Sequence, residues 1–248
     1  MSEKLLITII TCTYNSETTI ADCISSVKNQ TYSNIEHLII DGLSNDSTLK
    51  IIKSINPNCK IISEKDEGIY DAFNKGVLSA SGDIIGFLHS DDLFHDSDCV
   101  KKIISHFNNK YDGVYGNLNY ISKLDQAKII RKWRSRKYSH SLLSRGWMPA
   151  HPTLFLKNEV YKKHGGFNPE YKISADYDFM VRILNDRMLN FSFIPLVITK
   201  MRLGGNSNRS LLNLLRKMKE DYRIIKANKI GGFFTLLEKN FSKINQFF

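Results

Sequence analysis

Residues 83–92 read DIIGFLHSDD, a short apolar run that ends in two adjacent carboxylates. An apolar run of this length, rich in Ile, Phe and Leu, predicts a buried β-strand. Asp91 and Asp92 cannot follow it into a core, because an unpaired buried charge costs several kcal/mol or more. Two interpretations stay open: the pair caps the next helix, or its oxygens bind a hard divalent cation such as Mg2+ or Mn2+.

Strand and helix patterns alternate on the amino-terminal side of this stretch. Helices are expected where apolar residues recur on one face, as Ile20, Ile24 and Val27 do. The strands expected between these helices are 5–11, 35–40, 60–63 and 84–89. Alternation of this kind predicts right-handed βαβ units, and therefore an α/β fold with a mostly parallel sheet flanked by helices.

Acidic residues recur where these strands end. Asp41 follows the second strand, Asp66 the third, and Asp91 with Asp92 the fourth. In open α/β sheets, ligands bind in the crevice outside the carboxyl ends of the strands. We therefore expect these acids to share one crevice, which favours a binding site over a helix cap.

The second half of the chain has shorter patterns. A helix is expected to begin at Asp176, and strands at 114–115, 129–130, 151–156 and 197–201. Two helical stretches follow, at about 211–228 and 233–248, where Leu and Phe alternate with Lys and Arg. This basic amphipathic extension is expected either to pack on the core or to bind an anionic lipid surface.

Composition limits the class of protein. The 248 residues carry a net charge of +10, and residues 126–158 hold eight Lys or Arg without an Asp or Glu, which indicates an anionic partner. No run of 18 uncharged apolar residues predicts a membrane span, and no signal peptide pattern opens the chain. The four cysteines lack metal-like spacing and are expected to be free thiols. These features favour a cytoplasmic protein.

Eight segments, in this order and spacing, resemble the successive motifs of family 2 glycosyltransferases, from about Leu5 to Ser207. The segments are Thr13–Asn15, Asp41–Thr48, Asp66–Gly76, Gly82–Asp83, Ser90–Asp92, Gly165–Phe167, Ala175–Asp178 and Leu203–Ser207. The similarity is greatest to bacterial enzymes that build O-antigen or other surface polysaccharide. It implies a Rossmann-like GT-A fold over residues 1–207, with a nucleotide-binding half (1–92) and an acceptor-binding half (93–207), before a helical tail (208–248).

The resemblance also implies a UDP-sugar donor, a divalent metal (Mn2+ or Mg2+) and inversion at the anomeric carbon. Asp92 would bind the metal, Asp91 would lie near the ribose, and Asp41 would bind the uracil ring. Ser90 departs from many relatives, which carry an acid two positions before the metal ligand. The residues expected to contact the nucleotide sugar are Thr13, Tyr14, Asn15, Asp41, Asp66, Asn74 and Asp91.

Asp176 matches the catalytic acid of the family's Glu-Asp motif, in which Ala175 here replaces the Glu. A carboxylate at the start of a helix is kept ionised by the helix dipole, which suits a general base. The alternative is that Asp176 is only a helix N-cap. The resemblance and the basic stretch add further acceptor or phosphate candidates, for which structural roles are the alternative: His151, Arg131, Arg145 and Trp147.

The resemblance thus predicts an inverting, metal-dependent transferase. It would move a hexose or N-acetylhexosamine from UDP to a sugar on a polyprenyl diphosphate, at the cytoplasmic face of the inner membrane. A basic nucleic-acid-binding protein is the first alternative, although the chain has no recognisable nucleic-acid motif. A nucleotidyltransferase is the second, although Thr13-Tyr14-Asn15 stands where its Gly-rich phosphate loop would be.

Overall fold

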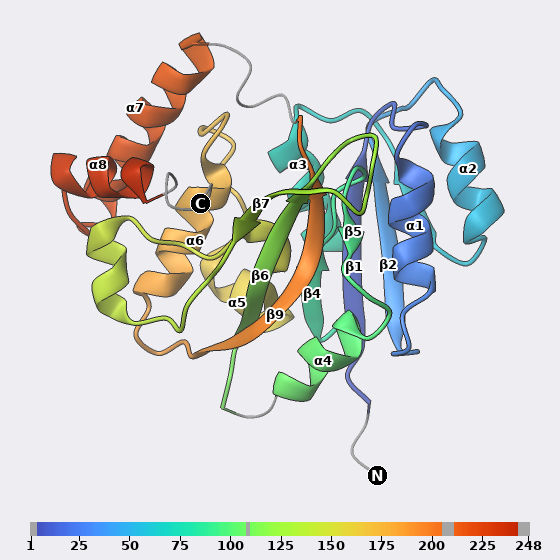
Figure 1. Ribbon diagram of the computed structural model, residues 1–248, viewed down its shortest axis with the longest axis horizontal. Helices are drawn as coiled ribbons and strands as arrows, with labels where there is room; N and C mark the ends of the chain where they lie inside the picture. Colours follow the sequence, from blue (N-terminus) through green and yellow to red (C-terminus); the bar gives the residue numbers. More distant parts are fainter. Residues whose placement is uncertain (1–3, 108–109, 205–210, 243–248) are drawn as a thin grey trace.

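The computed structural model describes residues 4–107, 110–204 and 211–242. A nine-stranded sheet passes through the molecule in the order β3-β2-β1-β4-β8-β6-β9-β5, and β7 pairs with β6 (Figure 1). This one sheet contains strands from both expected halves of the glycosyltransferase-like region. The predicted α/β fold with flanking helices is confirmed.

The first half of the chain follows the predicted βαβ pattern. Its four strands β1, β2, β3 and β4 are parallel to their neighbours in this half. The elements are β1 (Ile7–Thr13), α1 (Ile20–Lys28), β2 (Ile35–Asp41), α2 (Thr48–Ile55), β3 (Lys60–Ser63), α3 (Ile69–Ser79) and β4 (Ile84–Phe87).

The second half corrects the expectation of a mostly parallel sheet, because here the sheet is mixed. Pairs β4–β8, β6–β8, β6–β7 and β5–β9 are antiparallel, and only β6–β9 is parallel. The elements are β5 (Leu93–Phe94), α4 (Cys99–His106), β6 (Gly113–Ile121), β7 (Ile129–Trp133), the 3-10 turns η1 (His140–Arg145) and η2 (His151–Thr153), β8 (Phe155–Lys157), α5 (Asn158–His164), α6 (Ala175–Asn185) and β9 (Phe191–Arg202). The strand expected from His151 begins only at Phe155, because Pro152 has no N–H to donate to a ladder.

Both faces of the sheet are buried, which explains the continuous apolar runs of the strands. Along β1, Ile10 contributes to the core beneath α3 and α6, while Ile9 faces the opposite core beneath α1 and α4. The alternation of side chains along each strand therefore supplies two separate cores.

The C-terminal extension consists of α7 (Leu211–Ala227) and α8 (Phe233–Phe241), which lie beside α6 and η1 (Figure 1). Ile224, Ile225 and Leu236 are buried in the core that also holds α6. The predicted helical tail is thus confirmed over these ranges, while its boundary at residue 207 lies outside the described residues. Within the described part of the chain, no helix is long and apolar enough to cross a membrane.

Gly86 shows how closely β4 and β8 pack. It pairs with Phe155, and a Cβ at position 86 would lie 2.1 Å from the Phe155 ring, which is itself fully buried. We therefore expect Gly86→Ala to lower the free energy of unfolding by about 1–3 kcal/mol through overpacking, measured by urea denaturation.

The double variant Gly86→Ala/Phe155→Leu provides the control. Since the smaller side chain leaves room for the new methyl group, Phe155→Leu should cost less in the Gly86→Ala background than in the wild type. Equal costs in both backgrounds would show that the two side chains do not compete for space.

Candidate functional site

The carboxyl ends of β1, β2 and β3 are joined by backbone hydrogen bonds. The Gly42 N–H donates to the Thr13 carbonyl (2.9 Å), and the Glu64 N–H donates to the Asp41 carbonyl (2.9 Å). Asn15 joins the neighbouring loops, because its N–H donates to Ser44 Oγ and its side-chain oxygen accepts the Asn45 N–H (both 2.9 Å). The structure thus brings the predicted Thr13–Asn15 segment to the Asp41 loop.

Asp41 is fully buried at this edge. Its carboxylate accepts the N–H and hydroxyl of Ser44 (3.1 and 2.5 Å) and the hydroxyl of Ser63 (2.6 Å). These bonds fix the loop after β2. The direct contact with a uracil ring that the resemblance implied for Asp41 therefore has no support in this geometry.

Asp66 lies at the accessible part of the same edge. A Cβ on Gly42 would lie 2.5 Å from Asp66 Oδ2 and 3.5 Å from the Tyr14 ring, so the three residues meet at one corner. Tyr14 is 62% exposed and Asp66 is half-buried. This corner is the part of the predicted nucleotide site where an acid and an aromatic ring are open to a ligand.

Asn74 has a different role from the one predicted. Its amide nitrogen donates to the Phe167 carbonyl and its amide oxygen accepts the Phe167 N–H (both 2.8 Å). The side chain therefore fastens α3 to the Gly165–Phe167 turn, and we do not carry it forward as a donor contact.

Asp91 and Asp92 do not cap a helix, because α4 begins only at Cys99 and has Asp98 at its N-cap. Asp92 is fully buried, and its Oδ1 accepts the Arg202 N–H (3.2 Å). Asp92 Oδ2 has no hydrogen-bond partner among the described residues. Burial, together with the nearby charge of Asp91, raises the pKa of Asp92 well above its usual range.

These two carboxylates fit a divalent cation in their chemistry. An unpartnered buried oxygen beside a second, half-buried carboxylate is stabilised when a cation approaches. The described residues contain no group of three or more His, Cys, Asp or Glu able to hold a metal ion. Additional ligands would have to come from water or from a donor diphosphate.

Arg202, at the end of β9, was not predicted as part of the site. Its guanidinium donates to the Asp91 carbonyl (2.8 Å) and pairs with Asp22 of α1, and its side chain is 5% exposed. The hydroxyls of Ser90 and Ser16 lie 3.0 Å apart. The turn that carries the two acids is therefore held from several sides. Nothing in the sequence distinguishes Arg202 from the other basic residues.

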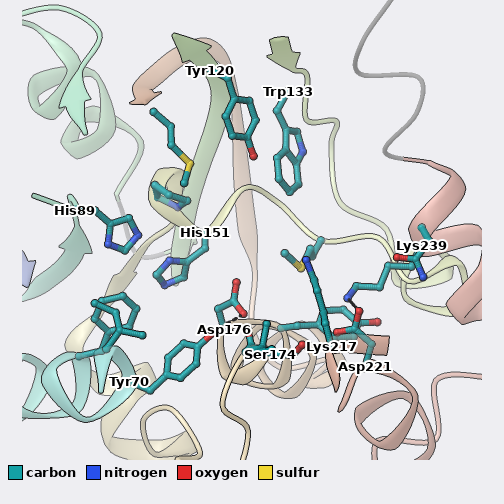
Figure 2. A pocket seen from close by; sticks show the side chains of 18 of the residues that line it. Tyr70, His89, Tyr120, Trp133, His151, Ser174, Asp176, Lys217, Asp221 and Lys239 are labelled. Carbon is teal, nitrogen blue, oxygen red and sulfur yellow. Dashed lines mark hydrogen bonds and ion pairs between the residues drawn. The ribbon is translucent and has the colours of Figure 1, made fainter. Parts of the chain in front are cut away.

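Beside this turn lies a cavity of about 430 Å3, shown in Figure 2. Its walls come from α3, β6, β7, α6 and β9 and also from α7 and α8. The lining residues that carry polar or aromatic groups include Tyr70, His89, Tyr120, Arg131, Trp133, His151, Ser174, Asp176, Tyr177, Lys217, Asp221 and Lys239.

Asp176 lies in the first turn of α6, where the N-cap is Ser174, so the N-cap alternative for Asp176 is wrong. Its Oδ1 accepts the Tyr70 hydroxyl (3.2 Å), which also lies 2.7 Å from the Ile173 carbonyl. Figure 2 shows the carboxylate directed into the cavity, between Tyr70 and His151. Burial and the charge of Asp176 raise the pKa of Tyr70, which therefore remains a hydrogen-bond donor.

Two histidines line the cavity next to Asp176. The rings of His89 and His151 stack with centroids 5.9 Å apart, and both stack on Phe73. Burial lowers the pKa of His151 to about 4 and also lowers the pKa of His89. Both imidazoles are therefore neutral near pH 7. His89 was not among the predicted site residues.

Of the three remaining acceptor or phosphate candidates, only one lines the cavity. Arg131 lines the cavity beside Tyr120 and Trp133, with its guanidinium carbon 4.8 and 5.8 Å from their ring centroids. Arg145 is exposed at the end of η1 and does not line the cavity. Trp147 packs against the core, edge-on to Tyr115 and stacked on Tyr138, which favours the structural alternative for this residue.

Glu220 of α7 was also missed. Its buried carboxylate accepts the N–H groups of Lys172, Ile173 and Ser174 (2.9–3.1 Å), which form the segment that enters α6. An acid within a basic amphipathic helix gives no sign of such a contact, because its partners lie 46 to 48 residues away.

We expect Glu220→Gln to lower the free energy of unfolding by about 1–3 kcal/mol, since one amide oxygen cannot replace a carboxylate that accepts three N–H groups. The amides of residues 172–174 should also exchange hydrogen faster, as measured by mass spectrometry. Glu238→Gln, at an exposed position of α8, is the matched control and should leave both measurements unchanged. Unaltered exchange at 172–174 in Glu220→Gln would contradict the proposed positioning role.

Comparison with known proteins extends these observations. The family model described as "Glycosyl transferase family 2" matches residues 8–167. An uncharacterised glycosyltransferase of Mycobacterium tuberculosis is 30% identical over 187 residues, covering 73% of this chain and 70% of that protein. A PGL/p-HBAD biosynthesis glycosyltransferase of Mycobacterium bovis is 27% identical over 210 residues, covering 82% and 79%.

Solved structures share the fold. S. aureus TarS superposes with a TM-score of 0.69 at 17% identity, covering 96% of this chain and 72% of that one. The mannosyltransferase PcManGT of Pyrobaculum calidifontis, in complex with GDP-Man and Mn2+, gives a TM-score of 0.67 at 14% identity, covering 96% and 70%. Of the three functions weighed from the sequence, these findings support the first: the chain belongs to glycosyl transferase family 2 and is a glycosyltransferase.

Proposed function

We propose that this glycosyltransferase is inverting and metal-dependent. It moves a hexose or N-acetylhexosamine from UDP to a hydroxyl of a sugar carried on a lipid diphosphate, in bacterial surface polysaccharide synthesis. The observation that carries the proposal is that His89, two residues before Asp91 in the chain, lines the same cavity as Asp176. The strand-end turn with Asp91 and Asp92 therefore adjoins the cavity that holds Asp176, as a donor and an acceptor that must meet would require.

A UDP-sugar donor is supported by the structural neighbours. One TarS structure holds UDP-GlcNAc, with a TM-score of 0.68 at 16% identity. In this chain the donor would occupy the strand-end edge, with its nucleoside beside Tyr14 and Asp66 and its diphosphate beside Asp91. Thr13 ends β1 and Asn15 lies in the loop that follows it, and Thr13 Oγ1 is buried without a hydrogen-bond partner among the described residues.

Mn2+ or Mg2+ would be held by Asp92, with Asp91 as the neighbouring acid and the donor phosphates as further ligands. The unpartnered Asp92 Oδ2 supports this choice, as does the Mn2+ in the PcManGT complex. When bound, a divalent cation stabilises the negative charge that develops on the departing nucleoside diphosphate. Arg202 then serves to position the turn from which both carboxylates project.

Asp176 would act as the general base. Its carboxylate accepts the proton of the acceptor hydroxyl, while that oxygen attacks the anomeric carbon from the side opposite to UDP. The Tyr70 hydroxyl keeps Asp176 Oδ1 oriented, and His151, whose imidazole is neutral, does not form an ion pair with this carboxylate. Displacement in a single step gives the inverted configuration.

Lipid-linked acceptors would be met at a membrane surface. Large apolar side chains on α7 and α8 are exposed, among them Leu212 (76%), Phe233 (58%) and Phe234 (81%). Exposed basic residues such as Arg216 and Lys219 lie on the same extension. This combination favours peripheral binding to anionic lipid on the cytoplasmic face of the inner membrane. The tail would thus pack on the core and face the lipid at once.

The metal assignment is tested by calorimetry of UDP binding with and without Mn2+. Asp92→Asn and Asp91→Asn should each weaken Mn2+-dependent UDP binding by roughly tenfold or more, because each removes a negative charge from the cation site. Asp125→Asn, at an exposed position in the turn between β6 and β7, is the control. If both site variants bind UDP with wild-type affinity in Mn2+, the cation is not held by this pair.

The role of Asp176 is tested by transfer kinetics. Asp176→Asn should lower the rate of transfer by roughly 10² or more, the scale on which a lost general base is felt, while UDP affinity stays close to that of the wild type. The exposed Glu170→Gln is the control for charge near α6. Transfer at the wild-type rate in Asp176→Asn would require a different base.

A further inference from the structure

The cavity continues past Asp176 to a second polar end. There Ser174 and Tyr177 of the α6 region meet Asp221 of α7 and Lys239 of α8. Figure 2 shows Asp221, Lys217 and Lys239 gathered on the side of the cavity away from His89, with Asp176 and Ser174 between. These residues lie outside the part of the chain that the family model matches.

Several polar atoms at this end are buried without hydrogen-bond partners among the described residues. They are Ser174 Oγ, Tyr177 Oη and Asp221 Oδ1, in residues that are 1%, 2% and 0% exposed. Asp221 does form an ion pair with the buried ammonium of Lys239. Because buried polar groups are nearly always satisfied in proteins, such a cluster facing a cavity is expected to bind water or the hydroxyl groups of a ligand.

The charges at this end favour a neutral ligand. The Asp221 carboxylate offsets Lys239, whose ammonium also lies 3.6 Å from the centroid of the Tyr177 ring. Apart from Arg131, the charged side chains of the lining are Lys217 and Lys239 with Asp176 and Asp221, so this end carries no excess of positive charge for a phosphate. Arg131 lies at the other side, beside Tyr120 and Trp133.

We propose that this end of the cavity is the subsite that binds the acceptor's sugar ring, through hydrogen bonds to its hydroxyl groups. Asp221 accepts from one hydroxyl, while the hydroxyls of Ser174 and Tyr177 donate to others. Burial and the charge of Asp221 raise the pKa of Tyr177, so its hydroxyl keeps its proton. A cavity of about 430 Å3 lies within the usual range for small-ligand sites.

This inference rests on the proposed function, because it names the part of the acceptor that the enzyme recognises beyond the reacting hydroxyl. A sugar seated between Asp176 and Asp221 would present one of its hydroxyls to the base and others to the far end. The subsite therefore selects among acceptors by the positions of their hydroxyl groups. A site built of buried hydrogen-bonding groups rejects a ligand that leaves them unpaired.

The experiment is saturation-transfer NMR on the full chain with UDP and Mn2+ present. The probes are the methyl β-glycosides of glucose, galactose and N-acetylglucosamine, with inorganic pyrophosphate as competitor. We expect at least one glycoside to bind the wild type, and Tyr177→Phe and Ser174→Ala each to weaken its binding by roughly threefold to tenfold, since each loses one hydrogen bond.

Tyr161→Phe is the matched control, since it removes a hydroxyl from a buried tyrosine of α5 that stacks on Phe179 and does not line the cavity. It should bind the glycoside as the wild type does. Binding to none of the three glycosides, equal binding by all variants, or displacement of the glycoside by pyrophosphate would each overturn the proposal. UDP affinity, measured on the same samples by calorimetry, reports separately on the donor site and hence on the proposed function.

Discussion

A buried guanidinium ties the two halves of this molecule together. Arg202, the last residue of β9, reaches the turn after β4 and the first helix, binding the Asp91 carbonyl and the Asp22 carboxylate while its own N–H meets Asp92. Removing one partner from such a buried charge costs about 3–5 kcal/mol. The position of the acidic turn is therefore set by a strand that lies 110 residues away in sequence. Because Met201 of the same strand lines the cavity, this contact links the acidic turn to one wall of the cavity.

The floor of the site is aromatic. Phe73, Phe87, His89, His151 and Phe167 form a cluster whose ring centroids lie 4.7–5.9 Å apart. Burial among these rings lowers the pKa of both imidazoles, outweighs the attraction of nearby carboxylates and keeps both rings uncharged. Asp176 thus borders an apolar floor on one side and polar walls on the other.

Local patterns predicted a large part of this fold, and non-local contacts account for what they missed. The strand ends that carry Asp41, Asp66 and Asp91 could be predicted because short apolar runs and helical spacing are properties of neighbouring residues. The direction of the strands in the second half could not be predicted, since the partners of β8 depend on chain crossings that leave no periodicity in the sequence. There is therefore no sign in the sequence that the sheet is mixed.

The residues of the site were likewise predictable only in part. Asp176 and His151 were found through motifs, and both line the cavity. Asn74 and Asp41 belong to the same motifs, yet their side chains bind the protein's own backbone and hydroxyls. The order of the motifs identifies these positions, but it does not distinguish a side chain that binds a ligand from one that holds the fold together. Glu220 and Asp221 escaped notice because two acids in a basic helix resemble ordinary surface charges until the helix is seen against α6.

Because α7 and α8 form part of the cavity wall, the tail is a part of the site as well as a support packed on the core. The family model ends at residue 167, whereas one wall of the cavity and the carboxylate that holds the entrance to α6 come from residues 214–240. Under the proposed function, the residues that hold the donor and those that bind the acceptor therefore lie in separate stretches of the chain. A substitution in the tail can then change which acceptor is bound while the strand-end acids stay as they are.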